Sequence, residues 1–158
     1  MKNKNLSFMT QAAMIAAIYV VLTYIFAPFS FGEVQVRISE ALTILPIFTP
    51  AAIPGLFAGC LIGNILGGAI LPDIVFGSIA TLIGAFFTWK LREQKPVVAT
   101  FPPIISNIII VPFVLRYGYG VTLPIPFMML TVGIGEVISC TVLGLIVYGA
   151  LKKYKSTL

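Results

Sequence analysis

Long apolar segments, separated by short stretches that carry basic residues, leave few folds open to this sequence. Four of them are easily delimited, at about residues 7–27, 73–90, 97–116 and 124–151. A helix needs roughly 20 apolar residues to cross a bilayer, and lipid requires every backbone polar group to be satisfied within the helix. Hydrophobic residues form 59% of the 158-residue chain and charged ones 9%, unlike any soluble domain of this size. We therefore predict one all-α integral membrane domain over residues 1–158.

The positions of the basic residues predict the number of crossings. They gather in three clusters, at residues 2–4, 90–95 and 152–155. Cytoplasmic flanks collect Lys and Arg, so all three clusters belong on one side, and residues 38–71 must then cross twice, at about 39–49 and 52–71. The result is a six-transmembrane-helix bundle in the cell membrane with both termini in the cytoplasm. This topology accounts for the net charge of +5 without a nucleic-acid partner.

Two of these segments carry distinctive small or helix-breaking residues. The segment 39–49 is short and contains Pro46, so we expect it to be tilted, broken or shielded by protein. The segment 52–71 has glycines four residues apart, which predict close contact with a neighbouring helix. Cys60 and Cys140 lie in apolar runs without metal-ligand spacing, and the chain has no His. We interpret both cysteines as packing residues and expect no metal, cofactor or disulfide.

Polar side chains within the apolar segments are the candidates for function. A charge at the centre of a span costs about 2.5–3.5 kcal/mol on insertion scales. Glu136 lies near the middle of the last segment beside two glycines, Asn107 near the middle of the fifth, and Asn64 in the third. We interpret each as a candidate solute contact. The alternative is structural: a protonated Glu136, or one bonded to Asn107, that only holds helices together.

Further polar residues lie near the predicted outer ends of the segments. Arg37 and Glu40 enter the segment 39–49 from the polar stretch that begins at Glu33, and the alternative to binding is that they pair with each other. Asp73 begins a helix after Pro72, where a carboxylate commonly caps the first turn. With Gln35 these residues predict a cavity open to the outside. Carboxylates and amides suit a small neutral or cationic solute better than an anion.

No motif in the sequence supplies chemistry or energy. The chain has no G-x-x-x-x-G-K-[ST] phosphate loop, no G-x-S-x-G and no H-E-x-x-H. We therefore predict that it is not an enzyme and cannot be its own ATPase. The sequence favours a substrate-binding subunit driven by partner proteins.

Small residues on the first segment are the predicted contact with that partner. Ala12 with Ala16, and Ala13 with Ala17, form two A-x-x-x-A pairs, which give a helix a flat face for close packing. Packing inside the bundle itself is the alternative.

These features resemble the substrate-binding (S) component of an energy-coupling factor (ECF) type ABC transporter. Within that group, four segments are similar to the QueT family, which is assigned to uptake of queuosine precursors: Val36-Arg37-Ile38-Ser39-Glu40-Ala41-Leu42, Gly63-Asn64, Asp73-Ile74-Val75-Phe76-Gly77-Ser78 and Gly133-Ile134-Gly135-Glu136. The resemblance covers essentially the whole chain. The Arg-Ile-Ser-Glu segment and the Gly-Glu of the last helix are its more specific elements.

The resemblance implies a mechanism and a solute. An S component binds solute from outside, docks through its first helix on a transmembrane coupling subunit, and reorients in the membrane as two ATPase subunits close. The implied solute is a 7-deazaguanine, either 7-aminomethyl-7-deazaguanine or queuine. Glu136 would accept hydrogen bonds from its guanine-like edge, Asn107 and Asn64 would read the remaining edge, and Glu40 or Asp73 would meet the 7-substituent.

Two alternatives remain beside this interpretation. One is an S component for a different vitamin, because a fold does not fix its ligand. The other is an oligomeric proton-coupled carrier of a small solute, with Glu136 as the proton site.

Overall fold

The structure, a computed structural model, describes residues 2–26 and 36–154, and these residues contain helices and no strand. The predicted all-helical class is confirmed for this part of the chain. In chain order the elements are α1 (Lys2–Ile25), the 3₁₀ helix η1 (Ile38–Ile47), α3 (Ala52–Leu66), α4 (Leu71–Lys90), α5 (Pro96–Ala99), α6 (Phe101–Tyr117), α7 (Ile125–Glu136), the π-helix η2 (Val137–Leu143), α8 (Gly144–Leu151) and η3 (Lys152–Tyr154).

Four helical stretches among the described residues are long and apolar enough to cross a membrane. They are Asn3–Ile25, Leu71–Lys90, Pro96–Tyr117 and Ile125–Leu151, and they match the four segments that the sequence delimits most clearly. The 10-residue η1 and the 15-residue α3 are shorter. The count of six crossings and the side on which the termini lie therefore remain predictions.

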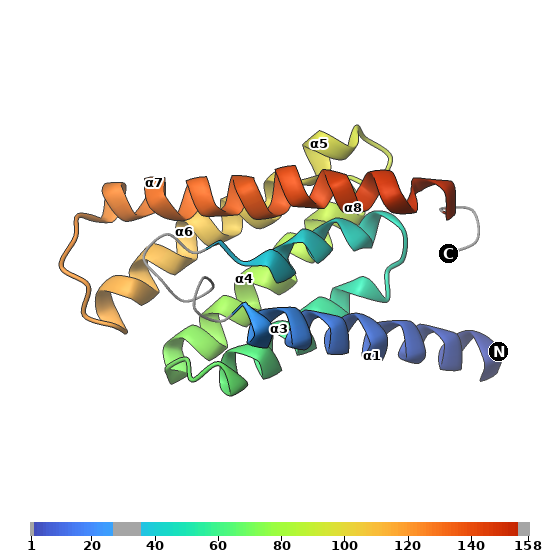
Figure 1. Cartoon of the computed structure of the whole chain (residues 1–158), viewed down its shortest axis with the longest axis horizontal. Helices are drawn as coiled ribbons and strands as arrows, with labels where there is room; N and C mark the ends of the chain where they lie inside the picture. The colour runs from blue at the N-terminus through green and yellow to red at the C-terminus, as the bar shows by residue number, and fades with distance from the viewer. Residues whose placement is uncertain (1, 27–35, 155–158) are drawn as a thin grey trace.

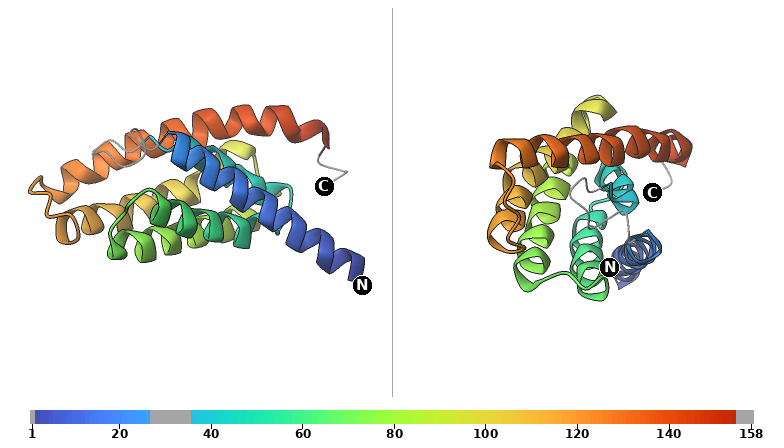
Figure 2. Two further views of the ribbon diagram at one scale, coloured as in Figure 1. Left: turned by 60° about the horizontal axis from the view of Figure 1, so that its bottom comes forward. Right: turned by 60° about the vertical axis from the view of Figure 1, so that its left-hand side comes forward.

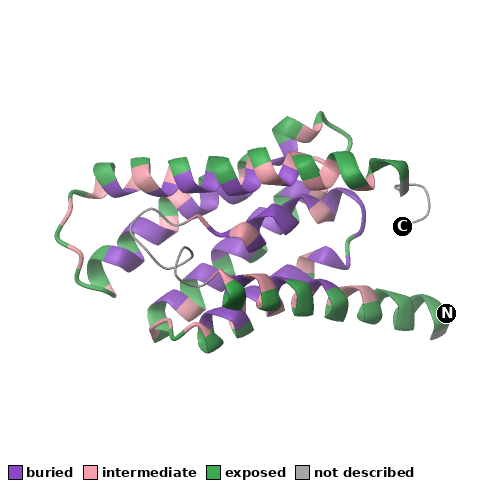
Figure 3. Ribbon diagram, in the orientation of Figure 1, coloured by how far each residue is buried: buried purple, intermediate pink, exposed green. Residues whose placement is uncertain are grey.

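The helices are arranged around η1. α1 packs on α3, α3 on α4, α4 on α6 and α6 on α7, while η1 contacts α1, α3, α4, η2 and α8 (Figures 1 and 2). All residues of η1 except Ile38 and Leu45 are buried (Figure 3). Of the three outcomes expected for this short segment, shielding by protein is the one that the structure shows.

η1 keeps the 3₁₀ form for ten residues, which is unusually long. Thr43 donates its hydroxyl to the carbonyl oxygen of Glu40 at 2.6 Å, and Pro46 has no backbone N–H with which to continue an α-helical ladder. A rise of about 2.0 Å per residue makes ten residues span roughly 20 Å, against about 15 Å for an α-helix. The short segment thus extends further through the bundle.

Glycines of α3 bring its backbone against α1. A Cβ atom on Gly55 would lie 2.8 Å from the carbonyl oxygen of Ala12, and one on Gly59 would lie 2.8 Å from Cβ of Tyr19 and 3.1 Å from the carbonyl oxygen of Ala16. The predicted close contact is confirmed. It also places Ala12 and Ala16 on the side of α1 that packs within the bundle.

Two helix boundaries differ from the sequence prediction for local reasons. α3 ends at Leu66 rather than near residue 71, because Gly68 adopts φ 79°, which closes the helix with a left-handed residue. The fifth segment is divided at Thr100, whose hydroxyl donates to the carbonyl oxygen of Val97 at 2.6 Å. Two prolines, Pro102 and Pro103, follow Thr100 within three positions and cannot donate to the ladder.

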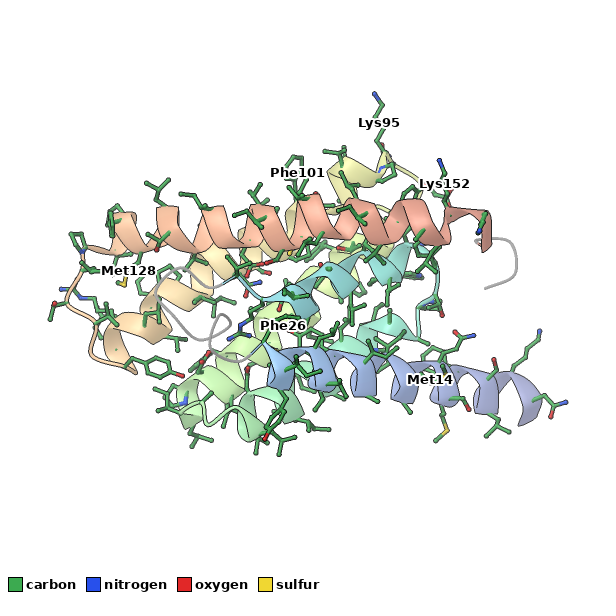
Figure 4. The ribbon with its side chains drawn as sticks, in the orientation of Figure 1. Met14, Phe26, Lys95, Phe101, Met128 and Lys152 are labelled. Atoms are coloured by element: carbon green, nitrogen blue, oxygen red, sulfur yellow. The ribbon has the colours of Figure 1, made fainter. Side chains whose placement is uncertain are left out.

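The chain ends lie together along the long axis of the molecule. Figure 1 shows both termini and α5 toward the same end, and Figure 4 shows Lys95 and Lys152 there, with Met128 near the opposite end. Lys95, Lys152 and the N-terminal end of α1 therefore lie toward one end of the described molecule, as a common membrane side requires.

Candidate functional site

A buried polar cluster is formed by side chains of α1, η1, α6 and the junction of α7 with η2. Its carboxyl groups belong to Glu40 and Glu136, which are 1% and 3% exposed, and its amide to Asn107, which is 5% exposed. These are residues that the sequence singles out, drawn from segments up to about a hundred positions apart. The fold brings them together.

Among the described residues, Glu40 is hydrogen-bonded through one of its two carboxylate oxygens. The hydroxyl of Tyr19 on α1 donates to Oε1 of Glu40 at 2.5 Å. Oε2 of Glu40 is buried and finds no hydrogen-bond partner in the part of the chain that the structure describes. An unsatisfied buried polar atom costs about 1–3 kcal/mol, so it requires a functional or structural explanation. A ligand that donates a hydrogen bond or carries positive charge would satisfy this oxygen.

Glu136 has two donors on one oxygen. Nδ2 of Asn107 lies 3.1 Å from Oε2 of Glu136, and Sγ of Cys140 lies 3.2 Å from the same atom. Asn107 also donates to the carbonyl oxygen of Pro103 at 2.9 Å, which fixes its orientation. One carboxylate oxygen each from Glu40 and Glu136 and the sulfur of Cys140 lie within 4.8 Å of one another.

The π-helix η2 begins directly after Glu136. π-helical turns are rare and occur frequently at functional sites, because the extra residue in each turn shifts the side chains that follow. Here Ser139 and Cys140 are both fully buried, and Oγ of Ser139 has no hydrogen-bond partner among the described residues. The π-helix therefore contains two polar groups in the interior, and one of them, the thiol of Cys140, belongs to the buried polar cluster.

A second polar group lies at the start of α4. The hydroxyl of Tyr119 donates to Oδ2 of Asp73 at 2.7 Å, and Nδ2 of Asn64 reaches the carbonyl oxygen of Asp73 at 3.5 Å. Gly77 leaves room for both, since a Cβ there would lie 3.2 Å from Nδ2 of Asn64 and 3.3 Å from Oδ1 of Asp73. Partial burial, and then the bond to Asp73, raises the pKa of Tyr119 to about 12.

Arg37 links the two polar groups electrostatically. Arg37 is 6% exposed, and its guanidinium interacts with the charges of Asp73 and Glu40. It also acts on Glu136. One buried cation therefore faces three carboxyl groups in the described interior, which favours a positively charged or donor-rich ligand over an anion.

The structure adds three residues that sequence reasoning did not assign to a site. Tyr19 binds Glu40, Tyr119 binds Asp73, and Cys140 binds Glu136, although the sequence indicates only packing for Cys140. The spacing of Glu136 and Cys140, four residues apart, was the available signal, since it places two helical residues on one face. Glu33 and Gln35, which belong to the polar stretch predicted to line the outer cavity, lie outside the described residues.

The two A-x-x-x-A pairs on α1 occupy different surroundings. Ala12 and Ala16 are partly buried and lie against α3, whereas Ala13 and Ala17 are exposed. Ala13 and Ala17 are therefore not covered by other described residues.

Open grooves occur on the surface of the described residues. Two of them, of about 470 and 530 Å³, adjoin along α4 and α6 and share Ile109 and Ile110 in their lining. Their walls are almost entirely apolar, as lipid contact requires.

The apolar helices and the buried charges define a multi-pass helical membrane protein with a polar site in its interior. The family model described as QueT transporter matches residues 9–153, and this chain belongs to that family. The chain is also 33% identical over 84 residues to the Queuosine precursor transporter QueT of Lactococcus lactis subsp. cremoris (strain MG1363). That match covers 52% of this chain and 48% of the relative, so it spans about half the length of each. No solved structure gives a significant match.

Proposed function

We propose that this protein is the substrate-binding (S) component of an ECF-type ABC importer and takes up a queuosine precursor. Membership of the QueT transporter family supports transport, and the name of the Lactococcus relative supports the solute. The observation that carries the proposal is the buried carboxylate oxygen of Glu40 that has no hydrogen-bond partner among the described residues. Glu40 also offers one carboxylate oxygen that lies within 4.8 Å of a ligand atom of Glu136 and of Cys140.

The chemistry of a 7-deazaguanine matches this cluster. Its ring N–H and exocyclic amino group donate a parallel pair of hydrogen bonds, which a carboxylate such as Glu136 accepts. The amide of Asn107 lies beside Glu136 and has a carbonyl oxygen as well as the N–H groups already used. A cationic 7-substituent would be met by Glu40, whose second oxygen needs a donor.

Asn64 and Asp73 form the second part of the proposed binding region. Asp73 is 2% exposed and already accepts from Tyr119, so it is a less available acceptor than Glu40. Asn64 lies beside it and contacts the thiol of Cys60 as well. We assign these two residues to the outer part of the proposed binding region. We place Arg37 between them and the buried polar cluster of Glu40, Glu136 and Asn107.

Energy for import would come from partner subunits. The chain has no phosphate loop, so two ATPase subunits and a transmembrane coupling subunit would drive the reorientation. The exposed face of α1 that holds Ala13 and Ala17 is the proposed contact with the coupling subunit. Because Ala12 and Ala16 pack on α3, their substitution would disturb the bundle as well as docking.

Calorimetric binding to the detergent-purified chain tests the solute assignment. The compounds are 7-aminomethyl-7-deazaguanine, queuine, guanine and riboflavin. We expect saturable binding of at least one 7-deazaguanine and none of riboflavin. Binding of riboflavin alone would assign the chain to a different vitamin, and binding of none would contradict a preformed solute site.

Uptake into liposomes distinguishes the S component from a carrier that works alone. We expect the purified chain to release or exchange no labelled solute by itself, and to support uptake when coupling and ATPase subunits and ATP are present. Uptake driven by a proton gradient with this chain alone would overturn the S-component assignment and support the proton-coupled alternative.

A further inference from the structure

Three side chains of the buried polar cluster carry atoms that can also bind a metal ion. Glu40, Glu136 and Cys140 each offer one ligand atom, these atoms lie within 4.8 Å of one another, and all three residues are buried. Carboxylate oxygen and thiolate sulfur bind Zn²⁺ at about 2.0–2.3 Å, which sets neighbouring ligands roughly 3.3–3.8 Å apart in a tetrahedral site. A small contraction would therefore bring the three atoms onto one ion.

We infer that Glu40, Glu136 and Cys140 bind a thiophilic divalent cation, Zn²⁺ or Cd²⁺, when no solute occupies the cluster. The inference goes beyond solute transport, although it uses residues of the proposed solute site. Oε2 of Glu40 has no hydrogen-bond partner among residues 2–26 and 36–154, and at 1% exposure it is shielded from water. A coordinated cation would satisfy this oxygen.

Neighbouring side chains already orient the ligands as an outer shell does in metal sites. Tyr19 donates to Oε1 of Glu40, and Asn107 donates to Oε2 of Glu136. Such hydrogen bonds fix the direction of a coordinating carboxylate and raise the affinity of the site. Three protein ligands leave a fourth position for water.

The charge balance favours a divalent ion. Two carboxylates and one thiolate carry three negative charges, while the ion and the guanidinium of Arg37, which acts on both carboxyl groups, carry three positive ones. On coordination the S–H bond of Cys140 breaks, the sulfur keeps the electron pair and bonds the metal, and the proton leaves to the buffer. The thiolate selects Zn²⁺ or Cd²⁺ over the harder ions Mg²⁺ and Ca²⁺.

Titration of the purified, solute-free chain with Cd²⁺ tests this site, because a Cd²⁺–thiolate bond gives a charge-transfer absorption in the ultraviolet. The chain has no His, so removal of an affinity tag leaves no imidazole background. We expect one equivalent of Cd²⁺ to produce the band, Zn²⁺ to suppress it by competition, and Mg²⁺ to leave it unchanged.

Two cysteine variants locate the ion. Cys140→Ser should abolish the band, whereas Cys60→Ser should keep it, because Cys60 is equally buried but does not belong to the group of three clustered ligand atoms in the described residues. Glu136→Gln should weaken Cd²⁺ binding by about tenfold or more. Absence of the band in the wild type, or its loss in Cys60→Ser alone, would overturn the inference.

The same titration separates this inference from the proposed function. If both hold, a bound 7-deazaguanine prevents formation of the Cd²⁺ band. If the metal binds but the 7-deazaguanine neither binds nor competes, the metal site stands and the solute assignment fails. If a 7-deazaguanine binds but no Cd²⁺ band forms, the solute assignment stands and the metal site fails.

Discussion

At the scale of single residues, the two buried glutamates depend on different donors. Glu40 relies on a phenol from α1, and Glu136 on an amide from α6 and a thiol from its own helix. For each donor there is a conservative substitution that removes one hydrogen bond and changes the volume of the side chain little. The contribution of each bond can therefore be measured separately.

Tyr19→Phe should destabilise the protein by about 1–3 kcal/mol, because it leaves both oxygens of Glu40 without a donor among the described residues. Thermal unfolding of the detergent-purified chain measures the loss. Tyr24→Phe is the matched control: Tyr24 lies on the same helix, is 67% exposed, and its change should stay within about 0.5 kcal/mol. Equal stability of the two variants would contradict the role given to Tyr19.

Tyr119 should titrate at high pH because burial and its bond to Asp73 raise its pKa to about 12. An unfolded tyrosine loses its proton near pH 10, so the folded protein keeps a proton that the unfolded chain has lost. The resulting stabilisation is complete below about pH 10 and disappears as the pH rises to about 12. The difference in tyrosinate absorbance between the wild type and Tyr119→Phe measures this titration. A midpoint near 10 would contradict both the partial burial of the Tyr119 hydroxyl and its bond to Asp73.

At the scale of the elements, the contact of α1 with α3 depends on missing side chains. Gly59 faces Tyr19 and the backbone of Ala16, so a methyl group has no space. Gly59→Ala should cost about 1–3 kcal/mol by overpacking. Gly149→Ala on α8, where no atom lies within 4 Å of the added Cβ, should be neutral or slightly stabilising. Thermal unfolding compares the two, and similar midpoints would contradict the packing described.

The sequence predicted the long helices well and the irregular ones poorly. Apolar length alone defines α1, α4, α6 and the stretch from α7 to α8, because the bilayer sets the required number of residues. The 3₁₀ form of η1 and the π-helix of η2 depend instead on tertiary contacts that leave no periodic pattern. Glu136 and Asn107 could be predicted because polar residues near the middle of an apolar segment stand out in the sequence. Tyr19 carried no such local signal, because its role depends on a hydrogen bond to Glu40 on another helix.

At the scale of the whole molecule, the common end shared by the termini and α5 makes the topology testable (Figure 1). Glu93→Cys lies in the turn after α4, where the native side chain is 83% exposed, and Tyr117→Cys lies at the far end of α6, where it is 76% exposed. The native cysteines are buried and give little background. In intact cells a membrane-impermeant thiol reagent should label Tyr117→Cys and not Glu93→Cys. The reverse pattern would place the termini outside.

The central claim is that a solute binds at the buried carboxyl cluster. Calorimetric titration of 7-aminomethyl-7-deazaguanine into the wild type, Glu136→Gln and Glu93→Gln tests it most directly. Glu93 provides the control because its carboxylate is exposed on the turn after α4. We predict a loss of affinity of about tenfold or more for Glu136→Gln, which corresponds to about 1.4 kcal/mol, and no change for Glu93→Gln. Unchanged binding by Glu136→Gln would contradict the claim and move the site away from the cluster.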